Sequence, residues 1–280
     1  MPDEINQASV RRFETRILAN HPLTPTIYDL RVEHPHPDFT PGQFVNIYLN
    51  RGDWLLPRPI SVADSGGDWI RLIYAVVGKG TERLSALQPG DKIDVTTILG
   101  HGFSIDSAST VIAVGGGVGV PPVYAAAKKA ASAGKKVVAI MGFRSDPILL
   151  NELAASIGAE NVRCAIEDGK AVPALRTAFP EIQFETGTVL TILKQLPVPK
   201  EGKALIVSCG PGPMMKAIQA FAPPDRFELQ FSLEERMGCG FGCCAGCVAD
   251  IRDRASGAIS RMGVCSKGPV FAGETVVFNV

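Results

Sequence analysis

The sequence predicts an antiparallel β-barrel, then a parallel-sheet α/β domain, and last a small cysteine-rich C-terminal domain. Residues 10–100 hold short alternating runs of apolar and polar residues, broken by Pro and Gly. From about residue 108 strand-like and helix-like segments alternate, and five of the seven cysteines lie at or after Cys239. The length of 280 residues suits more than one domain, at about 150 residues each. We therefore expect domains at 1–105, 106–226 and 227–280.

The first domain is expected to be all β, because alternation with a period of two, bounded by turn residues, is typical of half-buried strands. Five such runs are found, at residues 13–18, 28–32, 44–49, 69–77 and 92–97. Short strands at this spacing favour a small antiparallel barrel or sandwich.

The second domain alternates between the two kinds of element. Strands are expected at 110–114, 136–143, 161–166 and 204–208, and helices at 120–133, 149–157, 188–196 and 213–221. This alternation predicts a parallel sheet with helices on both faces. Such sheets bind ligands at the carboxyl ends of their strands.

The remainder, from about Phe227, is expected to contain one strand, a cysteine-rich loop and a β-like tail at 274–280. A segment of this size buries too little apolar surface to fold by core burial alone. A metal site would supply the missing stability.

Composition excludes several classes of protein. The formal net charge is zero, from 28 basic and 28 acidic residues, and no basic block suggests nucleic acid. No apolar run reaches the roughly 18–20 residues of a membrane span. The start, Met-Pro-Asp-Glu-Ile-Asn, lacks the features of a signal peptide. We expect a cytoplasmic protein, where clustered cysteines more often bind metal or do redox work than form disulfides.

Two loops of the second domain predict a nucleotide site. Gly115, Gly116, Gly117 and Gly119 follow a strand and open a helix. Glycines let the backbone approach a pyrophosphate, and a helix N-terminus favours an anion. The alternative is a tight strand–helix turn without a ligand. The second loop follows the strand at 204–208 and contains Cys209, Gly210, Pro211 and Met214. It should reach the same ligand, although a lone cysteine is more often simply buried.

Two motifs of the first domain are weaker signals. In Arg58-Pro59-Ile60-Ser61, at the end of an expected strand, Arg offers a fork for phosphate and Ser can hydrogen-bond a phosphate or a flavin edge. Gly78-Lys79-Gly80-Thr81 opens an expected helix at 81–87, whose N-terminal amides suit a second phosphate. The alternative for the first motif is a β-turn with a surface arginine.

The C-terminal cysteines predict a metal centre. Cys239, Cys244 and Cys247 show the spacing C-x4-C-x2-C, and Cys265 follows at a distance, as in [2Fe–2S] ferredoxins of the plant type. A structural zinc site usually shows two short Cys pairs, and only one is present here. Zinc remains the alternative. The four histidines all precede residue 102, so a Rieske centre lacks its ligands; they are expected at the surface or in loops.

Taken in order, these motifs resemble the ferredoxin–NADP reductase superfamily, over essentially the whole chain. The stretch from Leu233 to Cys247, together with 264–271, closely resembles the family of electron transfer subunits of NAD-dependent dihydroorotate dehydrogenases. The resemblance implies an FAD-binding barrel at 1–105, an NAD-binding domain at 106–226 and a [2Fe–2S] domain at 227–280.

The resemblance also implies which residues hold each group. The cluster ligands would be Cys239, Cys244, Cys247 and Cys265, with Cys243 a bystander. NAD would meet the two loops of the second domain, with Cys209 near the nicotinamide. FAD would be held by Arg58, Pro59, Ile60, Ser61, Ile73, Tyr74, Ala75, Gly80 and Thr81. The family often has Arg at the position of Ala75, so one phosphate contact is in doubt. The longer gap before Cys265 predicts a hairpin extension at 252–257.

The implied function is an oxidoreductase subunit in pyrimidine biosynthesis. Electrons would pass from the FMN of a dihydroorotate dehydrogenase catalytic subunit, through the cluster and FAD, to NAD+. Flavin must stand between the cluster, which carries one electron, and NAD, which takes a hydride, because flavin exchanges both. A heterotetramer with two copies of each subunit is expected. The alternatives are a reductase subunit of sulfide dehydrogenase, of NADH-dependent ferredoxin oxidoreductase or of sulfite reductase, and a non-catalytic zinc-stapled scaffold. The segment 143–146 leaves NAD and NADP open, and the resemblance favours NAD.

Overall fold

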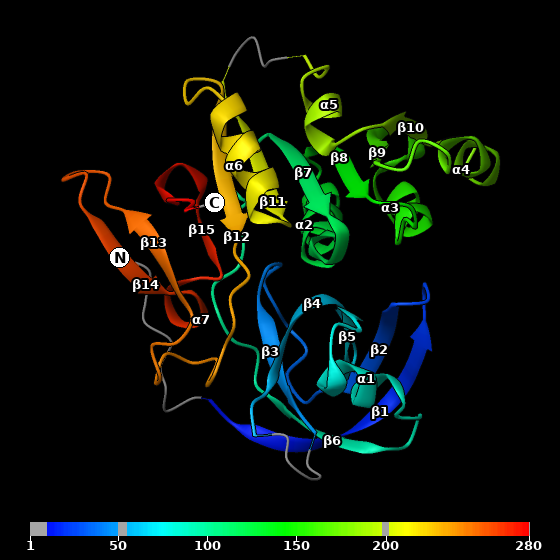
Figure 1. The fold of residues 1–280 in the computed structure, drawn as a ribbon, viewed down its shortest axis with the longest axis vertical. Coiled ribbons are helices and arrows are strands. Elements are labelled where there is room, and N and C mark those ends of the chain that lie inside the picture. The colour runs from blue at the N-terminus through cyan, green and yellow to red at the C-terminus, as the bar shows by residue number, and fades with distance from the viewer. Residues whose placement is uncertain (1–9, 50–54, 198–201, 280) are drawn as a thin grey trace. The chain divides into compact units, whose positions relative to one another are not determined.

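The computed structural model describes residues 10–49, 55–197 and 202–279 (Figure 1). Residues 1–9 of the expected first domain and Val280 of the expected tail lie outside this range. The chain forms two compact units. The first joins Met1–Gly102 to Leu233–Phe271, and the second joins Phe103–Ser232 to Ala272–Val280. The division into three domains at 105 and 226 stays a prediction.

The first unit contains a closed six-stranded barrel, which confirms the predicted fold class. Around the barrel the order is β1 (Arg12–Pro22), β2 (Ile27–Glu33), β5 (Trp69–Ala75), β4 (Arg58–Gly66), β3 (Phe44–Tyr48) and β6 (Lys92–Thr96). Neighbouring strands are antiparallel, including β6 with β1, which closes the barrel.

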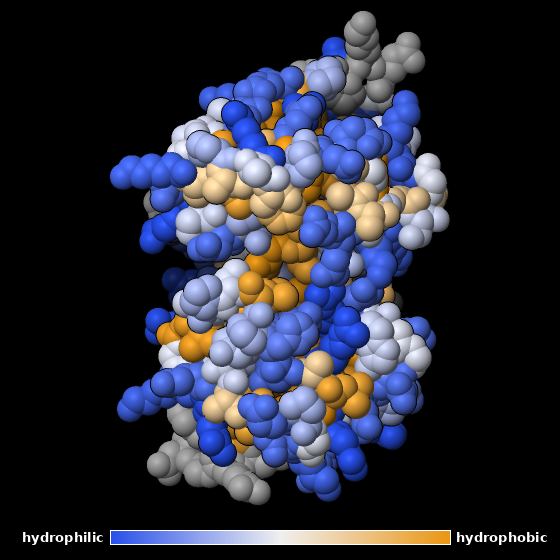
Figure 2. Space-filling model, turned by 90° about the vertical axis from the view of Figure 1, so that its right-hand side faces the viewer, coloured by the Kyte–Doolittle hydropathy of each residue, from blue (hydrophilic) through white to orange (hydrophobic). Residues whose placement is uncertain are grey.

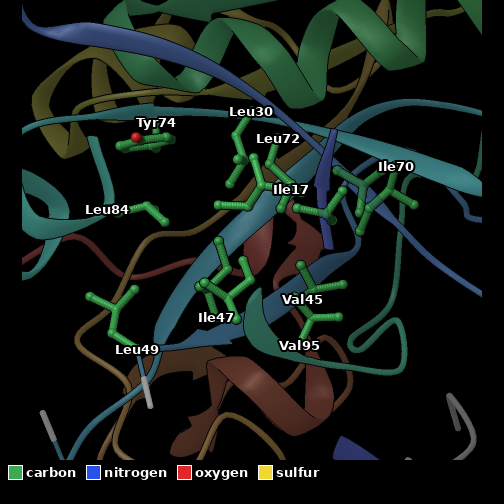
Figure 3. Close-up of a cluster of buried hydrophobic side chains, with 13 residues drawn as sticks. Ile17, Leu30, Val45, Ile47, Leu49, Ile70, Leu72, Tyr74, Leu84 and Val95 are labelled. Atoms are coloured by element: carbon green, nitrogen blue, oxygen red, sulfur yellow. The ribbon is translucent and has the colours of Figure 1, made fainter. Parts of the chain in front are cut away.

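The barrel is filled by the apolar half of each alternating strand. Each of the six strands contributes to this core, and Figure 3 shows side chains such as Leu30, Ile47 and Leu72 gathered in the barrel interior. The residues between them along a strand face outward. Leu30 and Val32 are in the core, whereas Arg31 between them is exposed. The period of two read in the sequence therefore fixes which face each residue takes.

Two details of the barrel differ from expectation. Arg58 begins strand β4 rather than ending a strand, and this nine-residue strand was not among the five predicted. Its run of Pro, Ser, Asp and Gly residues hides the alternation, because these residues are depleted in strands. Helix α1 covers Lys79–Ser85, so it starts two residues earlier than expected.

The second unit is built on a sheet in which six neighbouring strands are parallel, as predicted. The order is β10 (Gln183–Thr186), β9 (Val162–Ile166), β8 (Lys136–Phe143), β7 (Thr110–Gly116), β11 (Ala204–Cys209) and β12 (Phe227–Ser232). The short β15 (Val270–Ala272) follows β12 at the boundary between the units. β10 was not predicted, since its four residues are too few to show a period.

Helices connect these strands. α2 (Val120–Ser132) packs on β7, β8 and β11, with α3 (Leu150–Ile157) beside it. α5 (Val189–Leu193) and α6 (Gly212–Phe221) also lie side by side. Helix α4 (Val172–Ala178) was missed, because Pro173 and its short length weaken the helical pattern. One-turn 3-10 helices are η2 (Gly117–Gly119), η3 (Ala159–Asn161) and η4 (Gly273–Thr275).

The C-terminal segment forms a hairpin, β13 (Val248–Arg252) with β14 (Ile259–Gly263), followed by α7 (Val264–Lys267). This confirms the predicted hairpin extension. The expected β-like tail at 274–280 is only partly found, because η4 begins it and Val276 follows in a single β-bridge. The side-chain amide of Gln219 donates hydrogen bonds to the carbonyls of Gly273 (2.6 Å) and Val276 (2.9 Å), which fixes this segment.

His34 also differs from expectation, since it is buried with 1% of its surface exposed. Its Nδ1 accepts a hydrogen bond from the backbone N–H of His36 (3.2 Å). Its Nε2 lies 3.2 Å from the carbonyl oxygen of Thr96, which requires a proton on Nε2. Burial lowers the pKa of His34, so the ring is neutral in the fold.

The surface is mainly hydrophilic with apolar patches on the face drawn in Figure 2. Among the described helices, none combines the length and the apolar character that crossing a bilayer requires.

Candidate functional site

The two barrel motifs meet in the structure. Arg58 at the start of β4 packs its guanidinium against Gly80 in α1, and a β-carbon on Gly80 would collide with it. Arg58 also donates a hydrogen bond to the carbonyl of Leu56 (2.7 Å). Partial burial lowers the pKa of Arg58, which still carries its charge at neutral pH. A fixed cation beside the backbone of Gly80 is suited to a phosphate.

Thr81 shapes the loop next to this cation. Its hydroxyl oxygen accepts hydrogen bonds from the N–H groups of Val77 (2.9 Å) and Gly78 (3.2 Å), and the hydroxyl donates to the carbonyl of Gly78 (3.0 Å). Only 9% of Thr81 is exposed. The structure therefore uses the Thr81 hydroxyl to close the turn.

The segment from Ile73 to Ala75 has little side-chain surface to offer a ligand. Tyr74 points into the barrel core, stacks on Tyr28 with ring centroids 5.8 Å apart, and donates its hydroxyl to Asn20 (3.1 Å). Burial raises the pKa of Tyr74. Ile73 is also buried, and Ala75 is half-buried.

The two loops of the second unit pack against each other. β7 and β11 are neighbours, and Gly115 lies opposite Cys209. A β-carbon on Gly119 would collide with the backbone carbonyl of Cys209, and one on Gly116 would lie 2.7 Å from the sulfur of Met214. These glycines are therefore required for the close approach of the loops, which confirms that both lie at one edge of the sheet.

The donors for an anion at this edge come from the loop more than from the helix. Pro121 and Pro122 occupy the first turn of α2 and have no N–H. Gly117, with a φ of 55°, turns the backbone in the left-handed region, and space around it is open. Of the four glycines only Gly117 is partly exposed, and the role of the loop in binding a ligand stays a prediction.

Exposed apolar side chains border both motif regions. The large hydrophobic side chains that reach solvent among the described residues are Leu18, Leu23, Leu55, Leu56, Val77, Val118 and Ile259. Leu55 and Leu56 precede Arg58, Val77 precedes the α1 loop, and Val118 lies in the glycine loop. A flavin or nicotinamide ring is a ligand with the apolar faces that such side chains contact.

Backbone amides in the cysteine loop point at the sulfur of Cys239. The N–H groups of Phe241 (3.5 Å), Cys243 (3.2 Å) and Cys244 (3.4 Å) donate to this atom. Positive φ angles at Gly240 (80°), Gly242 (91°) and Ala245 (50°) produce this curled backbone. Such N–H donors stabilise the charge on thiolate ligands of iron–sulfur clusters.

The four predicted ligands are linked in two pairs. The N–H of Cys244 donates to the sulfur of Cys239 (3.4 Å), and the N–H of Cys265 donates to the sulfur of Cys247 (3.4 Å). Gly242 N–H donates to the Cys265 sulfur (3.1 Å), which ties one pair to the loop of the other. Two pairs of thiols side by side suit two iron atoms that share bridging sulfides. No three His, Cys, Asp or Glu side chains in the described part of the chain are arranged to hold a single metal ion.

The thiols differ in acidity. Burial alone would raise the pKa of Cys239, but the amides of Phe241, Cys244 and Cys243 outweigh it and lower that pKa to about 7. Burial, together with the nearby Cys247, raises the pKa of Cys265 to about 12. Of these two thiols, Cys239 is the more ready to bind a metal as a thiolate. Cys243, the expected bystander, is exposed, as is Cys244.

One polar contact of this loop was missed from the sequence. Asn46, in the middle of β3, donates its side-chain amide to the carbonyl oxygen of Cys239 (2.9 Å). The only signal was a polar residue inside the apolar run Phe44-Val45-Asn46-Ile47.

Comparisons with known proteins identify the family. Residues 234–277 match the family model of the iron–sulfur cluster binding domain of dihydroorotate dehydrogenase B, and residues 113–220 match that of the oxidoreductase NAD-binding domain. Among solved structures, an NADH-dependent reduced ferredoxin–NADP oxidoreductase is 27% identical, with a TM-score of 0.79 over 95% of this chain and 90% of that one. A ferredoxin reductase of carbazole 1,9a-dioxygenase is 18% identical and shares the fold, with a TM-score of 0.64 over 79% of this chain and 69% of that one.

Curated relatives agree over almost the whole length. A protein of Caldanaerobacter subterraneus subsp. tengcongensis is 32% identical over 95% of this chain and 99% of its own. A relative from Enterococcus faecalis is 34% identical over 93% of this chain and 96% of its own, and one from Listeria monocytogenes is 38% identical over 85% and 87%. All three are named dihydroorotate dehydrogenase B (NAD(+)), electron transfer subunit. This chain belongs to the family of electron transfer subunits of dihydroorotate dehydrogenase B (NAD(+)).

Proposed function

We propose that this oxidoreductase subunit carries electrons from a dihydroorotate dehydrogenase catalytic subunit to NAD+ in pyrimidine biosynthesis. The observation that carries the proposal is the first unit itself. It holds the flavin motifs on the barrel and the two cysteine pairs on the C-terminal segment, joined by the Asn46–Cys239 hydrogen bond.

FAD is assigned to the barrel. Arg58 supplies the cation for the phosphates, and the amides at the start of α1 supply donors. The hydroxyl of Thr81 holds the turn that presents these donors. Since Tyr74 is turned into the core, Ile73, Tyr74 and Ala75 contribute backbone rather than side-chain contacts. Val77, which is 85% exposed, gives the site an apolar border.

A [2Fe–2S] cluster is assigned to Cys239, Cys244, Cys247 and Cys265. The curled loop supports this assignment, because its N–H groups are directed at the sulfur atoms of Cys239 and Cys265. The two thiol pairs would hold one iron each. Cys244 is exposed, whereas Cys247 and Cys265 are buried, so the Cys244 side of the cluster would face a partner.

NAD is assigned to the paired loops of the second unit. Gly117 leaves its backbone open to the ligand, and Gly115, Gly116 and Gly119 let the buried part of the loop pack closely, while Cys209, Gly210, Pro211 and Met214 form the opposing wall. Cys209 stands at the end of β11, where a nicotinamide would approach. We favour NAD over NADP because the relatives are named as NAD(+) proteins. Arg144 and Asp146 both follow strand β8, so the charges there favour neither coenzyme.

When bound, the cluster supplies one-electron chemistry and FAD converts between single electrons and hydride, which NAD requires. The chain's own residues position these groups. The oxidation of the pyrimidine belongs to the FMN-containing partner. We propose a cytoplasmic heterotetramer with two copies of each subunit.

The test is Cys244→Ser in the complex purified anaerobically, with Cys243→Ser as the matched control. Cys244→Ser should abolish reduction of NAD+ by dihydroorotate but keep NADH oxidation by ferricyanide within about twofold. Cys243→Ser should leave both rates and the EPR signal of the reduced cluster unchanged. Full coupled activity in Cys244→Ser would refute the assignment. A colourless, zinc-containing protein would instead indicate a scaffold.

The second candidate is a flavin and iron–sulfur reductase serving another complex. It is favoured by the 27% identity to an NADH-dependent reduced ferredoxin–NADP oxidoreductase. The two candidates differ in the partner, so the protein that co-purifies from the native host and its response to dihydroorotate decide between them.

A further inference from the structure

Asn46 is a buried polar residue whose side chain leaves the barrel. It lies in the centre of β3, none of its surface is exposed, and its neighbours Val45 and Ile47 fill the barrel core. Alternation along the strand therefore turns Asn46 to the outer face. There its amide donates to the carbonyl of Cys239, a residue 193 positions later in the chain.

The backbone of Asn46 is fixed at the same point. Its N–H donates to the hydroxyl of Thr96 on β6 (3.0 Å). On the other side, Asn46 lies directly opposite Pro59 in the register of β3 and β4. Pro59 belongs to the flavin motif that begins with Arg58. Asn46 thus lies beside the strand that carries the flavin motif and is hydrogen-bonded to the backbone of a predicted cluster ligand.

The cysteine loop is shaped to accept this amide. Gly240 follows Cys239 with a φ of 80°, and a β-carbon there would collide with the Asn46 side chain. Gly240 is also buried. Only glycine allows the loop to lie this close to β3.

Tyr48 extends the same outer face two residues further along β3. The guanidinium of Arg12 lies 4.1 Å from the centre of its ring, and Arg12 is itself paired with Asp94 (2.7 Å). Tyr48 lies near Cys239 on this face. Asn46 and Tyr48 therefore lie on the outer face of β3 beside Cys239, the first cysteine of the loop, and Arg12 packs on the ring of Tyr48.

We infer that Asn46 is a positioning residue that holds the Cys239 end of the cluster loop on the flavin-bearing barrel, and thereby fixes the separation between cluster and flavin. The inference rests on the proposed function. Asn46 itself carries no electrons. Its side-chain amide acts on the cluster by holding the backbone carbonyl of Cys239, a predicted ligand. Removing such outer contacts commonly costs a metal site about 10–100-fold in affinity or activity.

The experiment compares Asn46→Ala and Asn46→Asp with Thr15→Val in the anaerobically purified protein. Asp keeps the size of the side chain but cannot donate from its carboxylate. Thr15→Val removes another barrel hydrogen bond, from the Thr15 hydroxyl to the carbonyl of Glu33 (2.6 Å), with no contact to the cysteine loop described. The readouts are FAD content, the rate of iron release to a chelator, and the EPR spectrum of the reduced cluster.

Both Asn46 variants should keep FAD but release iron about tenfold faster than the native protein, with an altered EPR spectrum. Thr15→Val should match the native protein. Equal iron release in all variants, or loss of FAD together with the cluster in both Asn46 variants, overturns the inference. Absence of flavin and cluster from the native protein itself would instead refute the proposed function.

Discussion

The guanidinium of Arg58 lies against the α-carbon of Gly80, so two flavin motifs from different parts of the barrel form one surface. Gly80→Ala should displace Arg58 and weaken FAD binding. Gly78→Ala is the matched control, because a β-carbon on Gly78 meets nothing within 4 Å.

FAD retained after gel filtration, measured by absorbance, distinguishes the two variants. We expect Gly80→Ala to lose at least about tenfold in affinity, the equivalent of 1.4 kcal/mol. Equal retention in both variants would show that Arg58 does not contribute to the site.

Gly119→Ala should separate the two nucleotide loops, because its β-carbon would meet the carbonyl of Cys209. The expected result is a KM for NADH raised by about tenfold or more with FAD content unchanged, since the barrel is not altered. Gly212→Ala serves as the control, as space around Gly212 is open. An unaltered KM in Gly119→Ala would contradict the assigned NAD site.

His34 predicts a loss of stability in mild acid. Burial lowers the pKa of His34 in the fold, so below its ordinary value near 6.5 the unfolded chain binds a proton that the native chain does not. The free energy of unfolding should therefore fall as pH drops from 6.5 towards the native pKa, by at most about 1.4 kcal/mol per pH unit.

Urea unfolding at pH 7.5 and pH 5.5 measures this effect. His34→Gln should flatten the difference, whereas His36→Gln, at an exposed position, should largely preserve it. An unchanged pH dependence in His34→Gln would assign the effect to other groups.

A buried ion pair in the barrel should be sensitive to the loss of one partner. Arg71 forms hydrogen bonds with both carboxylate oxygens of Asp29, at 2.6 to 3.0 Å, and both side chains are almost fully buried. Asp29→Ala removes a bidentate partner of the buried arginine and should cost about 3–5 kcal/mol in unfolding free energy.

The exposed pair of Lys92 and Glu14 provides the comparison, with side chains 60% and 57% exposed. Glu14→Gln should cost less than about 1 kcal/mol in the same urea titration. Similar costs for the two variants would mean that the Asp29–Arg71 pair is not desolvated in solution.

The sequence predicted what depends on local pattern. Gly115 to Gly119 follow an apolar run and precede a helical one, so their place at a strand end could be read directly. The cysteine spacing was likewise local. Chain order along a parallel sheet then placed Cys209 beside the glycine loop, because carboxyl ends of such strands meet at one edge.

Contacts between distant segments could not be predicted. Nothing near His34 in His-Pro-His-Pro indicates burial, which comes from the Phe13 ring, 5.1 Å away, and from Thr96. The same holds for Asn46 and Cys239, since no local pattern specifies which strand a curled loop will meet. Contacts such as Asn46 with Cys239 join segments far apart in the chain, so a single sequence does not reveal them.

The chain enters each of its two units twice, and this order decides which segments a domain graft must replace. The chain leaves the first unit after Gly102 and returns at Leu233, so most of the nucleotide unit is a continuous insert. The segment Ala272–Val280 from the far end of the chain completes this unit, and Gln219 donates hydrogen bonds to Gly273 and Val276 within it. A graft that changes coenzyme preference must therefore replace 103–232 and match these nine residues, and it can leave flavin and cysteine segments untouched.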